Sequence, residues 1–111
     1  MEITLRILCL AAGILFGSFL AAEYVARRLT GRTARDLGSG NPGMANIMAT
    51  LGKGPGFAVL AGDVAKTVLV CALCRFAIAP QLGHTALLYA GVGAILGHNY
   101  SLFHKGRGGK G

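Results

Sequence analysis

Three long apolar runs, separated by glycine-rich and basic segments, constrain this sequence more than any other feature. A helix needs about 20 predominantly apolar residues to cross the hydrocarbon layer of a bilayer. We predict membrane-spanning helices over about residues 3–26, 57–79 and 84–103. Only 14% of the residues are charged, against about a quarter in soluble globular proteins. The sequence therefore predicts an all-α, polytopic membrane protein that forms one domain over residues 1–111.

The distribution of basic residues predicts the orientation of these helices. Lysines and arginines concentrate in the loop 27–56 and in the glycine-rich tail 104–111, whereas Arg6 and Arg75 lie at the opposite ends of the runs. Loops rich in Lys and Arg stay on the cytoplasmic side of a membrane. We therefore expect a cytoplasmic loop and tail, three spans and an external N-terminus. A cleaved signal peptide is the weaker interpretation of the first run, because the chain downstream continues as a membrane protein.

The net charge of +7 raises nucleic-acid binding as an alternative. Nucleic-acid binders carry basic residues along a polar surface, but here those residues flank apolar runs, so we expect no nucleic-acid partner. Cys71 and Cys74 have the spacing of a redox or metal pair. No second pair and no nearby histidine accompany them, which favours small buried apolar residues. We expect neither a metal nor a cofactor.

A glycine-rich segment precedes a short predicted helix over residues 44–51, and it reads Gly-Ser-Gly-Asn-Pro-Gly from position 38 to position 43. Backbone N–H groups at a helix N-terminus bind anions, and glycine lets the backbone approach a phosphate closely. Ser39 and Asn41 could add hydroxyl and amide donors. The alternative is a turn with a helix cap, and the pattern alone favours that alternative.

The tail is the second candidate for phosphate binding, because residues 106–111 read Gly-Arg-Gly-Gly-Lys-Gly. Two cations among glycines suit a phosphate. The segment is not a Walker A loop, since Gly111 follows Lys110 where that motif needs Ser or Thr. A flexible basic tail beside anionic lipid headgroups explains the same residues equally well.

Ionisable residues inside the apolar runs form the third candidate. Asp63 and Lys66 are three positions apart and share one helix face. Such residues are costly in a membrane, and they usually pair or line a polar cavity. The sequence leaves two interpretations open: Asp63 and Lys66 form an ion pair with each other, or Lys66 faces an anionic substrate. His98 lies at the cytoplasmic end of the third run, where we favour an orienting role over a base because no carboxylate stands nearby.

Taken in order, these motifs resemble the PlsY family of bacterial glycerol-3-phosphate acyltransferases. They are G-S-G-N-P-G-M-A-N over 38–46, L-G-K over 51–53, D-V-A-K over 63–66, G-H over 97–98 and G-G-K-G over 108–111. The resemblance implies a multi-pass enzyme of the bacterial cytoplasmic (inner) membrane. It implies transfer of a fatty acyl group from acyl phosphate to glycerol 3-phosphate, giving lysophosphatidic acid and phosphate in the first step of phospholipid synthesis.

The resemblance also implies roles for individual residues. Ser39 is expected to contact substrate and Lys110 to neutralise a phosphate, so both are assigned to catalysis. Acyl phosphate is an activated donor, so no covalent nucleophile is needed, and the substrate's own phosphate takes the hydroxyl proton. The partners are then acyl phosphate, glycerol 3-phosphate and membrane lipid. The residues expected to bind substrate or phosphate are Gly38, Gly40, Asn41, Asn46, Lys66, His98, Gly108, Gly109 and Gly111.

The sequence departs from the family pattern at several positions. Ala45 and Ala49 stand where the family usually has Thr and Arg, and Tyr100-Ser101 replaces Phe-Pro after the histidine. The sequence given stops within the second glycine motif, and we expect it to resemble the N-terminal part of a divergent family member. The alternative is a non-catalytic membrane relative that binds anionic lipid or a partner. A transporter subunit, suggested by Asp63 and Lys66, would need more polar groups along its helices.

Overall fold

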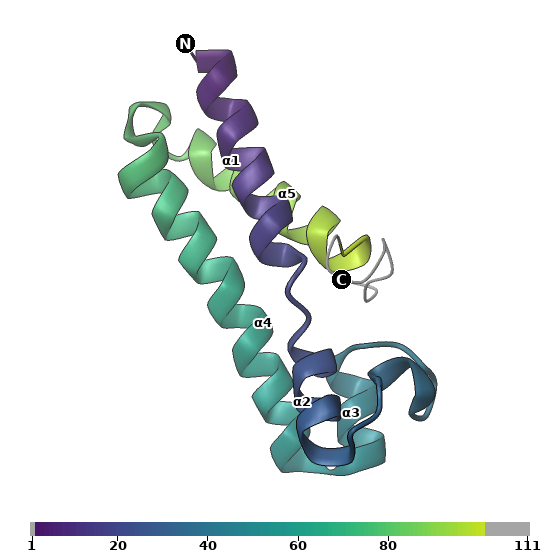
Figure 1. Ribbon diagram of the computed structural model, residues 1–111. Helices are drawn as coiled ribbons and strands as arrows, with labels where there is room; N and C mark the ends of the chain where they lie inside the picture. The colour runs from purple at the N-terminus through teal and green to yellow at the C-terminus, as the bar shows by residue number, and fades with distance from the viewer. Residues whose placement is uncertain (1, 102–111) are drawn as a thin grey trace.

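The computed structural model describes residues 2–101, and within that range every regular element is helical (Figure 1). The predicted all-α class is therefore confirmed for this part of the chain. The principal extents are 46 × 25 × 18 Å. The helices are α1 (Glu2–Gly17), α2 (Ala21–Thr30), α3 (Met44–Leu51), α4 (Lys53–Leu73) and α5 (Thr85–Asn99), and the short turns are η1 (Ala34–Asp36), η2 (Cys74–Ile78) and η3 (Pro80–Leu82).

Two helical stretches are long and apolar enough to cross a membrane. They are Glu2–Thr30 and Lys53–Ile78, and the second contains nearly all of the expected span 57–79. Large apolar side chains point outward along both, with Ile7 59% and Leu69 60% exposed, as lipid contact requires. The third expected span is α5, whose 15 residues extend about 22 Å. That is shorter than a hydrocarbon core of about 30 Å, so three spans and an external N-terminus stay predictions.

The closest helix packing joins α1 to α5, which cross in the upper half of the view (Figure 1). Gly13 on α1 meets Gly93 on α5, Gly17 on α1 lies against Ala94, and Gly97 on α5 lies against Ile14. A methyl group added at any of these four glycines would collide with backbone of the other helix. Small residues four positions apart allow this backbone contact between membrane helices. The glycines of the third run therefore fix the position of α5, including its C-terminal end.

The first expected span, 3–26, is not one continuous helix. The chain leaves helical geometry at Ser18 and resumes it at Ala21, with the Ser18 hydroxyl donating back to Ile14 O at 2.7 Å. At such a break, the carbonyls of Gly17 and Phe19 lack the N–H donors that an unbroken helix would give them. The structure therefore adds a break inside the expected span 3–26, which stays a prediction as a membrane crossing. The sequence did not indicate the break, because apolar composition continues through it.

The lower part of the molecule, where α2 and α3 pack against the first turns of α4 (Figure 1), is held by a buried glutamate. Glu23 is 3% exposed. Its carboxylate accepts from Thr33 Oγ1 at 2.6 Å and from Ala34 N at 2.8 Å. These bonds anchor the first turn of α2 to the start of η1 and so fix where the glycine-rich segment begins. In the sequence, Glu23 looked only like an interruption of the first apolar run.

Candidate functional site

The glycine-rich segment 38–43 folds around the side chain of Asn46, which is 6% exposed at the start of α3. Asn46 Nδ2 donates to the carbonyls of Leu37 and Asn41, both at 2.9 Å. Its Oδ1 accepts from Ser39 N at 3.0 Å and from Thr50 Oγ1 at 3.2 Å. One neutral amide therefore satisfies both donors and acceptors of the irregular backbone. A direct substrate contact by Asn46 stays a prediction, since its visible role is to shape the loop.

Two glycines of this loop adopt backbone conformations that other residues rarely adopt. The φ angle is 48° at Gly38 and 81° at Gly40, which is the left-handed region. A Cβ atom at Gly38 would also collide with Asn46 Oδ1 and Thr50 Oγ1. The turn itself therefore requires glycine, independently of any phosphate.

Most of the loop's backbone donors are already used. The N–H groups at positions 39, 40, 41 and 43 each donate to an oxygen within residues 37–46. The N–H groups of Met44 and Ala45, in the first turn of α3, have no acceptor in the described range, and Gly43 supplies no side-chain cap. Free donors thus lie at the N-terminus of α3, with the exposed Ser39 hydroxyl nearby in sequence.

Arg35 is the cation whose backbone adjoins this loop, because a Cβ at Gly40 would lie 3.0 Å from Arg35 O. Arg35 is half-buried, and its buried Nη2 has no hydrogen-bond partner in the part of the chain that the structure describes. Ala49, where the resembling family has arginine, is exposed on α3. Arg35 is accordingly the described residue best placed to supply positive charge at the loop.

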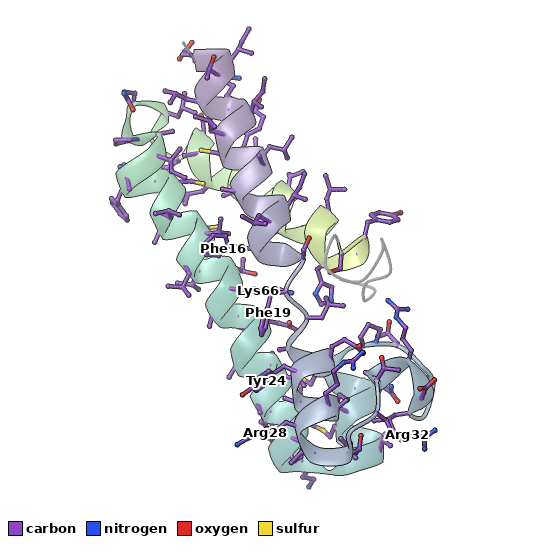
Figure 2. The ribbon with its side chains drawn as sticks, viewed as in Figure 1. Phe16, Phe19, Tyr24, Arg28, Arg32 and Lys66 are labelled. Atoms are coloured by element: carbon purple, nitrogen blue, oxygen red, sulfur yellow. The ribbon has the colours of Figure 1, made fainter. Side chains whose placement is uncertain are left out.

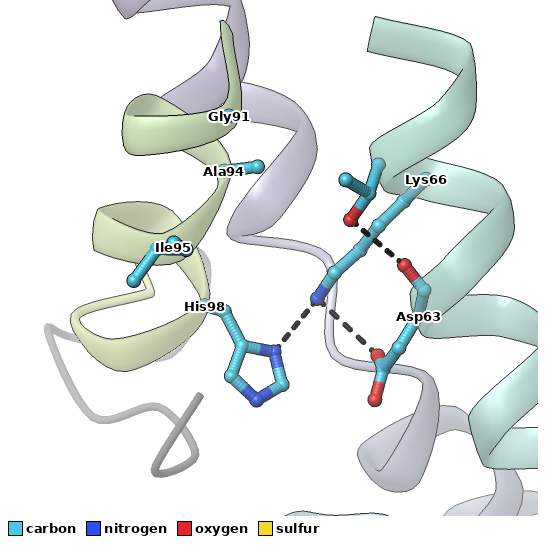
Figure 3. Close-up of a pocket in the computed structure, with 7 residues that line it drawn as sticks. Asp63, Lys66, Gly91, Ala94, Ile95 and His98 are labelled. Carbon is cyan, nitrogen blue, oxygen red and sulfur yellow. Dashed lines mark hydrogen bonds and ion pairs between the residues drawn. The ribbon is translucent and has the colours of Figure 1, made fainter. Parts of the chain in front are cut away.

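A second polar cluster surrounds Lys66 of α4, which is 6% exposed and lies beside the helix break (Figure 2). Its Nζ donates to Gly17 O at 3.0 Å and to Phe19 O at 2.7 Å. It lies 2.8 Å from His98 Nδ1 and 3.3 Å from Asp63 Oδ1 (Figure 3). An ammonium has three N–H donors, and the two carbonyls and the imidazole take all three. Asp63 then supplies the compensating charge.

The structure shows the Asp63–Lys66 ion pair that the sequence left open, whereas binding of an anionic substrate by Lys66 stays a prediction. Sequence reasoning missed the contact between Lys66 and His98, and also missed the break that Lys66 closes. His98 lies on α5, and the carboxylate of this cluster, Asp63, lies on α4. Lys66 stands between them and contacts both side chains. One sequence signal could have indicated the contact. Ionisable side chains in apolar helices usually pair with one another inside the helix bundle, and Asp63, Lys66 and His98 all lie in apolar runs.

A pocket of about 330 Å³ lies between α4 and α5 at this cluster (Figure 3). Asp63, Lys66 and His98 form its polar part, and Thr67 hydrogen-bonds to the backbone of its own helix. Small and apolar residues of α5 form the opposite wall: Gly91, Ala94 and Ile95. The pocket therefore combines hydrogen-bonding groups with an apolar surface.

The expected site residues fall into three groups. Gly38, Ser39, Gly40, Asn41 and Asn46 come together in the loop. Lys66 and His98 come together in the cluster, and no hydrogen bond or ion pair joins the two groups within residues 2–101. The expected phosphate-loop residues lie outside the described residues: Gly108, Gly109, Lys110 and Gly111.

Three features define the class of protein: helices of membrane-spanning length, a polar cluster at a helix break, and a loop beside free N–H groups at a helix N-terminus. This class is a helical membrane protein whose polar groups suit an anionic ligand. The profile of the glycerol-3-phosphate acyltransferase family matches residues 7–111, and the chain belongs to this family.

Relatives support this assignment along nearly the whole chain. A glycerol-3-phosphate acyltransferase 1 from Deinococcus radiodurans is 42% identical over 107 residues, covering 95% of this chain and 51% of the relative. One from Lactobacillus acidophilus is 36% identical over 106 residues, covering 96% of this chain and 50% of the relative. The chain thus spans about half the length of these relatives.

Solved structures show the same fold. The crystal structure of PlsY (YgiH), an integral membrane glycerol 3-phosphate acyltransferase in its glycerol 3-phosphate form, matches with a TM-score of 0.76 at 32% identity. The match covers 96% of this chain and 52% of that protein. Its lysophosphatidic acid form matches with a TM-score of 0.74.

Proposed function

We propose that this chain carries the glycerol 3-phosphate and acyl phosphate site of an acyltransferase that makes lysophosphatidic acid. The observation that carries the proposal is the loop 38–46, which folds around Asn46. Within residues 2–101, the first N–H groups of α3 have no acceptor, and the Ser39 hydroxyl, whose oxygen accepts from Asn41 N, has its proton free to donate. The acyltransferase family assignment supports the reaction, and the glycerol 3-phosphate form of the similar structure supports the acceptor.

The proposed reaction needs positioning and charge stabilisation more than a covalent nucleophile. The 1-hydroxyl of glycerol 3-phosphate attacks the carbonyl carbon of acyl phosphate, a C–O ester bond forms, and the C–O bond to phosphate breaks. The hydroxyl proton passes to the departing phosphate. Ser39 and Lys110 contact phosphate or reacting oxygens, and preorganised donors of this kind lower the barrier where charge develops. Gly38, Gly40 and Asn41 hold the loop, while Gly108, Gly109 and Gly111 let backbone amides approach the phosphate.

The proposed location is a bacterial cytoplasmic (inner) membrane, with several crossings and the loop 27–56 on the cytoplasmic face. Four arginines in the first part of this loop support that orientation: Arg27, Arg28, Arg32 and Arg35. A reporter fused after Gly111 is expected to give a cytoplasmic signal. An external signal would overturn the proposed topology.

The reaction is tested with the purified chain in liposomes, supplied with acyl phosphate and labelled glycerol 3-phosphate. Labelled lysophosphatidic acid is expected. Ser39→Ala and Lys110→Ala should each lower the rate by roughly 100-fold, the size typical for loss of one preorganised donor. Arg32→Ala is the matched control, because Arg32 is an exposed loop cation whose side chain has no bonded partner within residues 2–101, and its rate should stay unchanged.

Two outcomes would contradict the proposal in different ways. Glycerol 3-phosphate binding without product would favour the alternative, a non-catalytic relative that retains an anion site. Product formation that Ser39→Ala and Lys110→Ala leave intact would keep the reaction and remove these two residues from it.

A further inference from the structure

The atoms around Lys66 Nζ determine which nitrogen of His98 carries a proton. A lysine ammonium donates but cannot accept. Lys66 Nζ lies 2.8 Å from His98 Nδ1, so a charged Lys66 makes Nδ1 the acceptor. A neutral imidazole then carries its only proton on Nε2.

The surroundings of Asp63 favour this assignment over its reverse. In the reverse case, a neutral Lys66 amine would accept from Nδ1–H, and the carboxylate 3.3 Å away would lose its compensating charge. Asp63 Oδ1 is buried and receives no hydrogen bond from the described residues 2–101, as expected when the three ammonium protons point to Gly17 O, Phe19 O and His98. An unpaired buried charge is strongly destabilising, so the ammonium form fits the geometry.

His98 Nε2 is left as a donor at the pocket. No partner binds this nitrogen within residues 2–101, and the ring turns it away from Lys66 (Figure 3). His98 lines the pocket together with Ala94 and Ile95. A pocket with one neutral N–H donor and an apolar wall suits an amphiphile that has an anionic oxygen next to a hydrocarbon chain.

We propose that Lys66 locks His98 as the tautomer protonated on Nε2, and that this N–H donates to a phosphate oxygen of acyl phosphate bound between α4 and α5. The proposal rests on the proposed function for its substrate. It makes His98 a donor that touches substrate, not a base, and makes Lys66 a positioning residue that acts through the imidazole.

The tautomer is measured directly by nuclear magnetic resonance of ¹⁵N-histidine-labelled protein in lipid bicelles, with His98→Gln identifying the His98 signals. Wild-type protein should show a protonated Nε2 and an unprotonated Nδ1. The double variant Asp63→Asn/Lys66→Met removes both charges together, and it should show a mixture of tautomers. A proton on Nδ1 in the wild type would overturn the inference, as would an unchanged tautomer in the double variant.

The donor role is measured by titrating the chain with a hydrolysis-resistant acyl phosphonate. A glutamine amide reaches the position of Nε2, whereas the shorter asparagine amide reaches only that of Nδ1. His98→Asn should weaken binding by roughly 10- to 100-fold, as for loss of a hydrogen bond to a charged group. His98→Gln should stay within about threefold, because it retains that bond. Circular dichroism shows whether both variants are equally folded.

The outcomes separate this inference from the proposed function. Equal binding by His98→Asn and the wild type would overturn the donor role while lysophosphatidic acid synthesis stands. A wild type that binds no acyl phosphonate and forms no product would overturn the proposed function and, with it, the donor role. The tautomer result would still decide whether Lys66 orients His98.

Discussion

The loop 38–46 around Asn46 and the cluster around Lys66 both satisfy the backbone groups of an irregular segment, but with different side chains. Each buries one polar side chain that hydrogen-bonds to backbone groups of an irregular segment. The hydrogen-bond partners of Asn46 lie no more than 12 positions away along the chain. Those of Lys66 lie 32 to 49 positions away. The loop is thus organised locally, and the helix break is organised by tertiary structure.

The difference follows from what surrounds each segment. The loop carries exposed residues such as Gly38 and Ser39, so water can satisfy backbone groups there when a side chain does not. The break lies within an apolar stretch, where unsatisfied carbonyls cost several kcal/mol and must find protein donors. Lys66 supplies two of its three N–H groups to those carbonyls, and Asp63 offsets its charge. The geometry of the break therefore depends on contacts between helices, whereas the hydrogen bonds of Asn46 within the loop are local.

The largest expected effect comes from breaking the long-range cluster. Lys66→Met should lower the free energy of unfolding by about 3–5 kcal/mol. It leaves two carbonyls and the half-buried Asp63 carboxylate, whose Oδ1 is buried, without their partner. The measurement is unfolding in mixed micelles with increasing SDS, followed by circular dichroism.

Asp63 provides the control for that substitution. Adding Asp63→Asn to Lys66→Met removes the uncompensated charge, so the double variant should regain part of the lost stability. If Lys66→Met alone costs less than about 1 kcal/mol, as a surface pair would, Lys66 does not hold the break.

The same contrast explains what the sequence predicts and what it misses. Glycine, serine and asparagine in the segment 38–46 predict a turn, because turn chemistry depends on neighbouring residues. The apolar runs predict all-helical structure for a similar reason. The break at Ser18 has only a weak local signal in Gly17-Ser18, since Phe16, Phe19 and Leu20 continue the apolar pattern. It depends on a lysine 47 positions from Phe19, and hydropathy cannot report that pairing. The contact between Lys66 and His98 escapes prediction for the same reason.

A second, smaller effect tests whether the packing of α1 against α5 positions His98 in the cluster. Gly97 precedes His98, and a methyl group there would collide with the backbone of Ile14 and Ser18. Gly97→Ala should cost about 1–3 kcal/mol through overpacking and should perturb the ¹⁵N signals of His98. Gly91→Ala is the matched control on the same helix, because nothing lies within 4 Å of its added methyl. It should be neutral, or stabilising by up to about 1 kcal/mol. Equal effects of the two substitutions would contradict packing control.

The smallest expected effect falls on the locally organised loop. Asn46→Asp keeps an acceptor for Ser39 N but turns the donor to Leu37 O and Asn41 O into a second acceptor. It should cost about 1–2 kcal/mol, measured by the same SDS titration, since water can enter the loop. Thr50→Val removes only one bond at an exposed position, and should cost less than about 0.5 kcal/mol. Because the loop and the cluster share no bond, Asn46→Asp should weaken glycerol 3-phosphate binding without moving the His98 tautomer. A shifted tautomer would show that the two regions are coupled after all, and that the division between local and long-range organisation is wrong.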